Sequence, residues 1–169
     1  SAMAAIIGLD TDKIKEICAE TANMTNQCVQ AVNFNCPGQI VIAGATEAVH
    51  KACDRLKEAG AKRAILLPVS APFHSTLMQP AADRLKEVLD SVEIVDAKIP
   101  VVANVNAKPE TKADEIRSQL VLQAASPVLW EDSVRRMMND GVDTFVEVGP
   151  GKVLCGFIKK VDRSYAPLN

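Results

Sequence analysis

The sequence CVQAVNFNCPGQIVIAG, residues 28–44, predicts two β-strands joined by a tight turn. Residues 28–35 alternate apolar and polar side chains, which is the pattern of a strand with one buried face. The tripeptide CPG at 36–38 is typical of a turn, and residues 39–44 form a second apolar run. Because so few residues separate the two runs, an antiparallel hairpin is the natural connection between them.

The segments on either side of this hairpin extend the pattern to six elements. Apolar residues at helical spacing predict a helix over 11–24, and residues 46–60 form the clearest amphipathic helix in the chain. Short apolar runs at 3–9 and 62–69 predict two more strands. Strand, helix, strand, strand, helix, strand is the order of the ferredoxin-like split βαβ arrangement. Residues 1–70 are therefore expected to form a small subdomain in a protein of the α/β class.

The remaining residues, 71–169, are expected to form part of a larger subdomain. Their periodicity predicts helices at 75–92, 112–125, 128–141 and 152–161, and strands within 99–107 and 144–151. So few strands among several amphipathic helices do not complete a layered sheet. This second part is therefore expected to belong to a larger assembly of elements.

The composition argues against several classes of protein. The chain is 48% hydrophobic and 24% charged with a net charge of -2, which offers no basic field for nucleic acid or an acidic membrane. Its five cysteines form no C-x-x-C pair, so neither a disulfide framework nor a zinc site is expected. No apolar run has the length of a membrane span and no leader is evident, so we expect a cytoplasmic protein.

The two histidines differ in their setting. His50 lies within the predicted 46–60 helix among polar neighbours, so we expect it at the surface. His74 follows the predicted 62–69 strand, and Pro72 is interpreted as the residue that stops the strand and presents His74 on a loop. An imidazole there could take a proton from a hydroxyl or thiol, or it could simply cap a helix. The adjacent Ser75 is not expected to be the nucleophile that His74 activates, because neighbouring side chains diverge at the backbone, and it is instead predicted to be the N-cap of the following helix.

Two polar turns allow both a structural and a ligand-binding interpretation. VGPGKV, residues 148–153, is a glycine turn before a helix, but Val153 stands where a phosphate-binding loop needs Ser or Thr. A structural turn is therefore favoured. Asn33 and Asn35 could bind a ligand or satisfy the end of the hairpin. No serine lies in the G-x-S-x-G pattern of an exposed nucleophile.

Six stretches together resemble the second half of the malonyl-CoA:acyl-carrier-protein transacylases of bacterial fatty-acid synthesis. In order, they are MAAIIGL (3–9), VNFNCPGQIVIAG (32–44), AKRAILLPVSAPFHSTLMQPAADRL (61–85), PVVANVNA (100–107), LQAASPVLWEDSV (122–134) and VEVGPGKVL (146–154). The likeness runs from about Ala2 to about Lys160. It implies an α/β-hydrolase-like large subdomain with an inserted ferredoxin-like small one.

The resemblance also implies roles for individual residues. His74, within APFHS, matches the catalytic base of the family, and Gln123 matches the glutamine whose backbone carbonyl orients that base. Phe73 is similar to the residue before the histidine in malonyl-selective acyltransferase domains of polyketide synthases. The hairpin residues expected to face the substrate cleft are Asn33, Asn35 and Gln39.

The activity implied by the resemblance is malonyl transfer from malonyl-CoA to acyl carrier protein through an acyl-serine, with no metal or redox cofactor. The full-length family member is expected to be a monomer that binds no nucleic acid. The 169 residues carry the histidine but not the family's G-H-S-x-G serine, its first oxyanion donor or its malonyl-binding arginine, so this chain alone is expected to be inactive.

Two other functions remain open at this stage. The chain could be a module that binds acyl carrier protein, and the cations Lys57, Lys62 and Arg63 could then form its docking patch. A ferredoxin-like RNA-binding domain is disfavoured by the acidic pI of about 5.7 and by the absence of exposed aromatic residues on the predicted strands.

Overall fold

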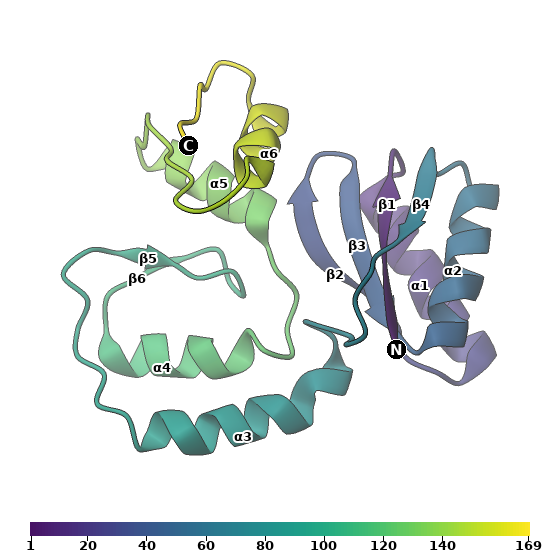
Figure 1. Cartoon of the computed structure of the whole chain (residues 1–169), viewed down its shortest axis with the longest axis horizontal. Helices are drawn as coiled ribbons and strands as arrows, with labels where there is room; N and C mark the ends of the chain where they lie inside the picture. Colours follow the sequence, from purple (N-terminus) through teal and green to yellow (C-terminus); the bar gives the residue numbers. More distant parts are fainter.

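The computed structural model describes residues 1–169, and its first part is a four-stranded sheet with two helices packed on one face (Figure 1). In chain order its elements are β1 (Ala2–Ile7), α1 (Thr11–Thr25), β2 (Val29–Cys36), β3 (Gln39–Gly44), α2 (Thr46–Glu58) and β4 (Arg63–Leu66). The strands lie in the order β2-β3-β1-β4, and each pairs antiparallel with its neighbours. This order confirms the predicted split βαβ arrangement.

The β2–β3 hairpin forms where the sequence predicts it. Cys36 pairs with Gln39 across a turn in which Gly38 has a φ of 76°, a conformation that glycine adopts without strain. At the other end, a Cβ on Gly44 would lie 2.0 Å from the carbonyl oxygen of Cys28, so only glycine fits beside β2. The pairing register shifts twice along β2, between Ala31 and Asn33 and again before Cys36. These irregularities change which way the polar residues of the hairpin point.

The sheet has a buried core on each face because its strands alternate. On β1, Ala4 and Ile6 face the helices and join the main core, whereas Met3 and Ala5 face the opposite side. The second face carries a smaller cluster against which Leu67 packs. The helices add their apolar stripes to the main core, whose other members include Ile14, Ile17, Val29, Ile42, Val49 and Leu56. The first part of the chain therefore has a hydrophobic core of its own.

The second part of the chain is more open. Its elements are the 3-10 helix η1 (Thr76–Met78), α3 (Gln79–Asp90), β5 (Val101–Val102), β6 (Pro109–Glu110), α4 (Ala113–Leu122), α5 (Trp130–Asn139) and α6 (Val153–Val161). Helices α3 and α4 pack on each other, and so do α5 and α6 (Figure 1). Of the 29 buried residues in the chain, those beyond residue 70 are Ser75, Ala82, Glu110, Val128, Ser133, Val134, Cys155 and Ile158.

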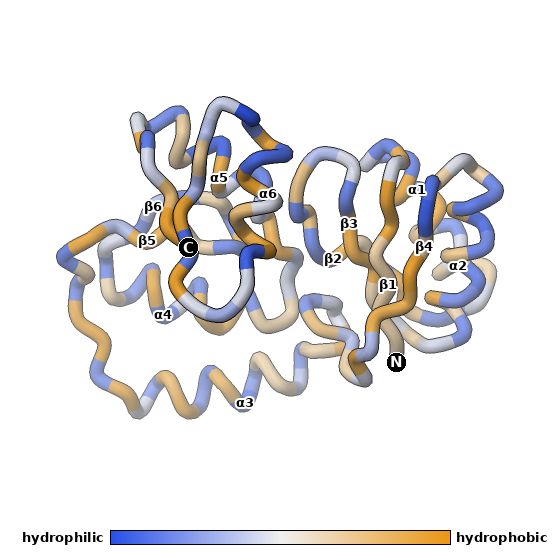
Figure 2. The backbone as a smooth tube through the Cα atoms, turned by 45° about the horizontal axis from the view of Figure 1, so that its top comes forward, coloured by the Kyte–Doolittle hydropathy of each residue, from blue (hydrophilic) through white to orange (hydrophobic).

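Large apolar side chains of this part remain in solvent. The connection between α3 and β5 is apolar along much of its length (Figure 2), yet Val95 is 69% and Ile99 77% exposed. Soluble proteins seldom leave so many large apolar side chains uncovered in one region.

The division of the chain at residue 70 stays a prediction. None of the helices combines the length and apolar character needed to cross a membrane.

The predicted strand at 144–151 is wrong. Only Val146 pairs there, in an isolated parallel bridge with Leu168. Gly149 and Gly151 both have positive φ values and Pro150 has no N–H to donate, so the backbone turns instead of extending. A strand also needs a neighbour along its whole length, and Val148 is 93% exposed.

Candidate active site

The loop that carries His74 begins earlier than the sequence indicates. Strand β4 ends at Leu66, and Leu67 makes one last backbone hydrogen bond to Met3 before Pro68, which has no N–H, interrupts the ladder. Pro72 therefore does not stop the strand. Instead its carbonyl accepts a hydrogen bond from the backbone N–H of Ser75, at 3.2 Å, and so closes a turn around His74.

Ser75 lies at the N-cap position of η1, as predicted, but its side chain makes no capping hydrogen bond. Its side chain is 1% exposed, and its hydroxyl donates back to the Pro72 carbonyl at 2.6 Å. Because the hydroxyl bonds to that carbonyl, it stabilises the turn and caps no backbone amide of the following helix. His74 lies inside this turn with a φ of 62°, in the left-handed region. Histidine, asparagine and aspartate are the side chains other than glycine that most often adopt this region.

The imidazole of His74 is held by a backbone carbonyl. Its Nδ1 lies 2.9 Å from the carbonyl oxygen of Gln123, the residue that caps the C-terminus of α4. The last carbonyls of a helix have no partner within the helix, so this oxygen is available to accept. Because a carbonyl can only accept, Nδ1 carries the hydrogen and Nε2 carries the lone pair. This is the tautomer in which Nε2 can take a proton from a substrate or nucleophile.

The segment after Gln123 runs along the outer edge of β2. The backbone N–H of Val128 donates to Val32 at 2.7 Å, and the N–H of Phe34 donates to Val128 at 2.9 Å. Asn33, between these two β2 residues, is therefore bridged to Val128. The structure thus brings Val128, five positions after the residue whose carbonyl holds His74, against the predicted site residue Asn33 at the edge of the small sheet.

The other predicted site residues are more widely spread. Gln39 lies beyond the hairpin turn, and its side-chain oxygen accepts from Lys160 of α6 at 3.2 Å. Asn35 lies at the same end of β2, partly buried, and Phe73 is 45% exposed beside His74. The His74 loop contacts β2 near its start instead, at Gln30. Asn35 lies five positions beyond Gln30 along the strand, which corresponds to about 16 Å.

The 148–153 turn has a structural role in this fold. The carboxylate of Glu147 accepts from the backbone N–H groups of Leu154, at 3.2 Å, and Cys155, at 2.9 Å, at the start of α6. The amides that could have bound a phosphate are thus bonded by the chain itself. The Cys155 amide is the main reason why the pKa of Glu147 lies below its usual value. The favoured interpretation of this turn is therefore supported.

This capping carboxylate makes stability depend on pH. Since the pKa of Glu147 is lowered in the folded chain, its stabilising effect is complete above the unfolded value of about 4.3 and is lost as pH falls through the folded pKa. We expect Glu147→Gln to lower the urea midpoint of unfolding at pH 7. At pH values below the folded pKa of Glu147, we expect the variant and the parent chain to have the same urea midpoint. Glu93→Gln, on an exposed connection, is the control. An equal deficit for Glu147→Gln at every pH would contradict this role.

Sequence reasoning missed Gln30. Its side-chain oxygen accepts hydrogen bonds from both the backbone N–H and the hydroxyl of Thr76, two residues after His74. In the sequence, Gln30 looks like any polar residue of a half-exposed strand. Only the tertiary structure brings its side chain to Thr76.

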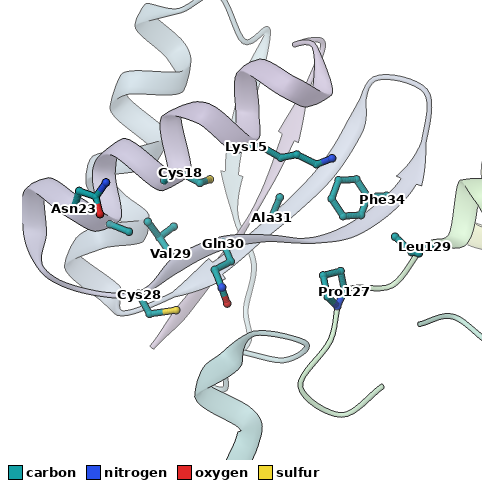
Figure 3. A pocket seen from close by; sticks show the side chains of 12 residues that line it. Lys15, Cys18, Asn23, Cys28, Val29, Gln30, Ala31, Phe34, Pro127 and Leu129 are labelled. Atoms are coloured by element: carbon teal, nitrogen blue, oxygen red, sulfur yellow. The ribbon is translucent and has the colours of Figure 1, made fainter. Parts of the chain in front are cut away.

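Gln30 also lines a cavity of about 570 Å³ between α1, the start of β2 and the segment around Pro127 (Figure 3). At the far side of this cavity the amino group of Lys15 lies 5.1 Å from the centre of the Phe34 ring. His74 is not among the lining residues, so the cavity and the histidine are separate features of the β2 edge.

Comparison with known proteins identifies the family. Residues 3–167 match the family described as acyl transferase domain. The chain is 51% identical over 162 residues to the malonyl CoA-acyl carrier protein transacylase of Bacillus subtilis and 52% identical over 160 residues to that of Escherichia coli K12. These matches cover 96% and 95% of this chain but 51% of each relative, so the chain spans about half their length.

Solved structures agree with these matches. A malonyl-transacylase in complex with the holo acyl-carrier protein of a type II polyketide synthase is 47% identical, with a TM-score of 0.95, and the match covers 98% of this chain and 53% of that one. The acyl carrier protein S-malonyltransferase of Vibrio cholerae is 46% identical, also with a TM-score of 0.95, over 99% of this chain and 54% of its own. With a family match that spans nearly all of its residues, the chain belongs to the acyl transferase domain family.

Proposed function

We propose that this chain supplies the general base of a malonyl-CoA:acyl-carrier-protein transacylase. The observation that carries the proposal is the contact between His74 Nδ1 and the Gln123 carbonyl, because in the neutral imidazole it places the hydrogen on Nδ1, leaves the lone pair on Nε2 and fixes the plane of the ring. The relatives named as malonyl transacylases support the substrate class. Malonyl-CoA and acyl carrier protein are accordingly its proposed partners, in a cytoplasmic enzyme that is monomeric at full length and binds no nucleic acid.

The proposed reaction has two half-reactions. His74 Nε2 takes the proton of a serine hydroxyl while the serine oxygen attacks the malonyl thioester. The carbon–sulfur bond then breaks, and the leaving thiolate of coenzyme A takes the proton from the imidazolium. In the second half-reaction His74 takes the proton of the phosphopantetheine thiol, whose sulfur attacks the malonyl ester. The serine oxygen leaves and recovers that proton, so neither a metal nor a redox cofactor is required.

The serine of this scheme lies outside the 169 residues, none of which forms a G-x-S-x-G pattern. We propose that it comes from the part of the family's length that this chain does not match. The exposed apolar side chains of the second part, such as Val95, Ile99 and Val148, are candidates for the surface that this other part covers. We also propose that the 169-residue chain alone is inactive, because it lacks this serine.

A chimera tests the proposed function. Residues 1–169 would replace the matching segment of the Bacillus subtilis transacylase, which is 51% identical to them. We expect the chimera to transfer malonyl groups from malonyl-CoA to holo acyl carrier protein, and we expect the 169-residue chain alone to transfer none. A folded chimera without transfer activity, or an active chain alone, would contradict the proposal. The readout is the amount of malonyl-carrier protein formed.

A non-catalytic carrier-binding module is the second candidate. The observation in its favour is the relative solved in complex with an acyl-carrier protein. The predicted docking patch of Lys57, Lys62 and Arg63 lies at the end of α2 and the start of β4, and Lys57 also pairs with Asp54 at 3.9 Å. Carrier protein that binds the 169-residue chain while the chimera stays inactive would favour this candidate.

A further inference from the structure

The turn that carries His74 is attached to the small sheet through one side chain of β2. The side-chain oxygen of Gln30 lies 2.9 Å from the backbone nitrogen of Thr76 and 3.1 Å from its hydroxyl oxygen. In Figure 3, Gln30 points from β2 toward the neighbouring turn and helix, away from Phe34. Cys28, two residues earlier on the chain, adds a contact of 3.6 Å between its sulfur and the same hydroxyl.

The bonds on either side of His74 show why this attachment matters. The backbone N–H and the hydroxyl of Ser75 both donate to the carbonyl of Pro72, and these two bonds shape the turn without placing it in the fold. Hydrogen bonds to other parts of the fold place the turn: the imidazole bonds to the Gln123 carbonyl, and Thr76 bonds to Gln30, with the sulfur of Cys28 beside the same Thr76 hydroxyl. If the bonds from Thr76 to Gln30 are lost, the left-handed conformation of His74 is held mainly at the Gln123 end.

We propose that Gln30 is a positioning residue for His74, which acts by holding the turn so that Nδ1 stays on the Gln123 carbonyl. The inference rests on the proposed function, since it concerns the same histidine. Two donors converge on one oxygen, so the position requires an acceptor at the end of a side chain of this length. Glutamate supplies that acceptor, asparagine is one CH2 group too short, and alanine lacks it.

The first test uses the 169-residue chain and does not depend on activity. Nitrogen NMR of the imidazoles reports the tautomer of His74, with exposed His50 as an internal reference. In the parent chain we expect His74 to be fixed with hydrogen on Nδ1. In Gln30→Ala we expect averaged tautomers and exchange of the Thr76 amide faster by about tenfold, the size expected for loss of one or two hydrogen bonds.

Two further variants separate positioning from general damage. Gln30→Glu should restore the fixed tautomer and the slow exchange of the Thr76 amide. Gln27→Ala removes another glutamine three residues away, which bonds to Glu47 and not to the His74 turn, and it should change neither signal. A fixed tautomer in Gln30→Ala, or an equal effect in Gln27→Ala, would overturn the proposal. If Gln30→Ala does not fold, the comparison of Gln30→Glu with Gln30→Asn decides in the same way.

A second test reads the consequence for turnover in the chimera. Gln30→Ala should reduce kcat by about tenfold with little change in the KM for malonyl-CoA, because the turn and not the substrate is affected. If the chimera is inactive but the NMR results are as expected, the proposed function is contradicted, while the role of Gln30 in positioning His74 stands. If the activity of the chimera depends on His74, but His74 keeps its fixed tautomer in Gln30→Ala, only this inference is contradicted.

Discussion

Replacing His74 with asparagine is expected to lower malonyl transfer by the chimera about 10²- to 10⁴-fold, the usual contribution of a general base. Asparagine is the suitable replacement because the φ of 62° at this position strains most side chains, and asparagine tolerates it. The loss of rate is then due to the missing imidazole. The measurement is the initial rate of malonyl-carrier protein formation at saturating malonyl-CoA.

His50→Asn is the matched control for this substitution. His50 is exposed on α2, so the same chemical change there should leave the rate unaltered. A His74→Asn chimera that keeps its circular dichroism spectrum and transfers malonyl groups at the parent rate would exclude His74 as the base. Equal losses in both variants would point to damage unrelated to the site.

Leu56→Ala is expected to have the largest effect on stability. Leu56 is fully buried between α2 and the sheet, in the main core. Removing three carbon atoms there leaves a cavity and should reduce the free energy of unfolding by about 2–5 kcal/mol. Small proteins are stable by only about 5–15 kcal/mol in total, so much of the chain's stability would disappear. Urea unfolding of the 169-residue chain measures the change.

Leu66→Ala is the matched control for Leu56→Ala. The Leu66 side chain is 48% exposed at the end of β4, so much of it is already in water. Leu66→Ala should therefore lower the free energy of unfolding by well under half as much as Leu56→Ala. Equal losses for the two leucines would contradict the placement of the core between the helices and the sheet.

The fold of the first part was predictable because its signals are local. Alternation along β2, the turn at Gly38 and the helical spacing of α1 and α2 each depend on a few neighbouring residues, and together they bury the main core. The second part lacks such a core. The apolar run at 144–151 has the composition of a strand, but it remains mostly unpaired because the chain offers only Leu168 beside it.

His74 could be singled out from its place after a predicted strand, but its pairing with Gln123 was predictable only through family resemblance. Nothing in the spacing of His74 and Gln123, 49 residues apart, indicates that they touch. The contact depends on where α4 ends relative to the turn. The same limit applies to Gln30 and to Ser75, whose partners are decided by the tertiary fold and by local turn geometry. Residue type and position in the sequence alone indicate a polar strand residue at Gln30 and a helix cap at Ser75.

The most direct test of the central claim is the location of the malonyl group in the chimera after brief exposure to malonyl-CoA. Peptide mass mapping should find one malonyl ester, on a serine of the Bacillus subtilis segment, which holo carrier protein then removes. The His74→Asn chimera should form this ester slowly or not at all. A malonyl group on residues 1–169, or equally rapid ester formation without His74, would contradict the claim that this chain contributes the base and not the nucleophile.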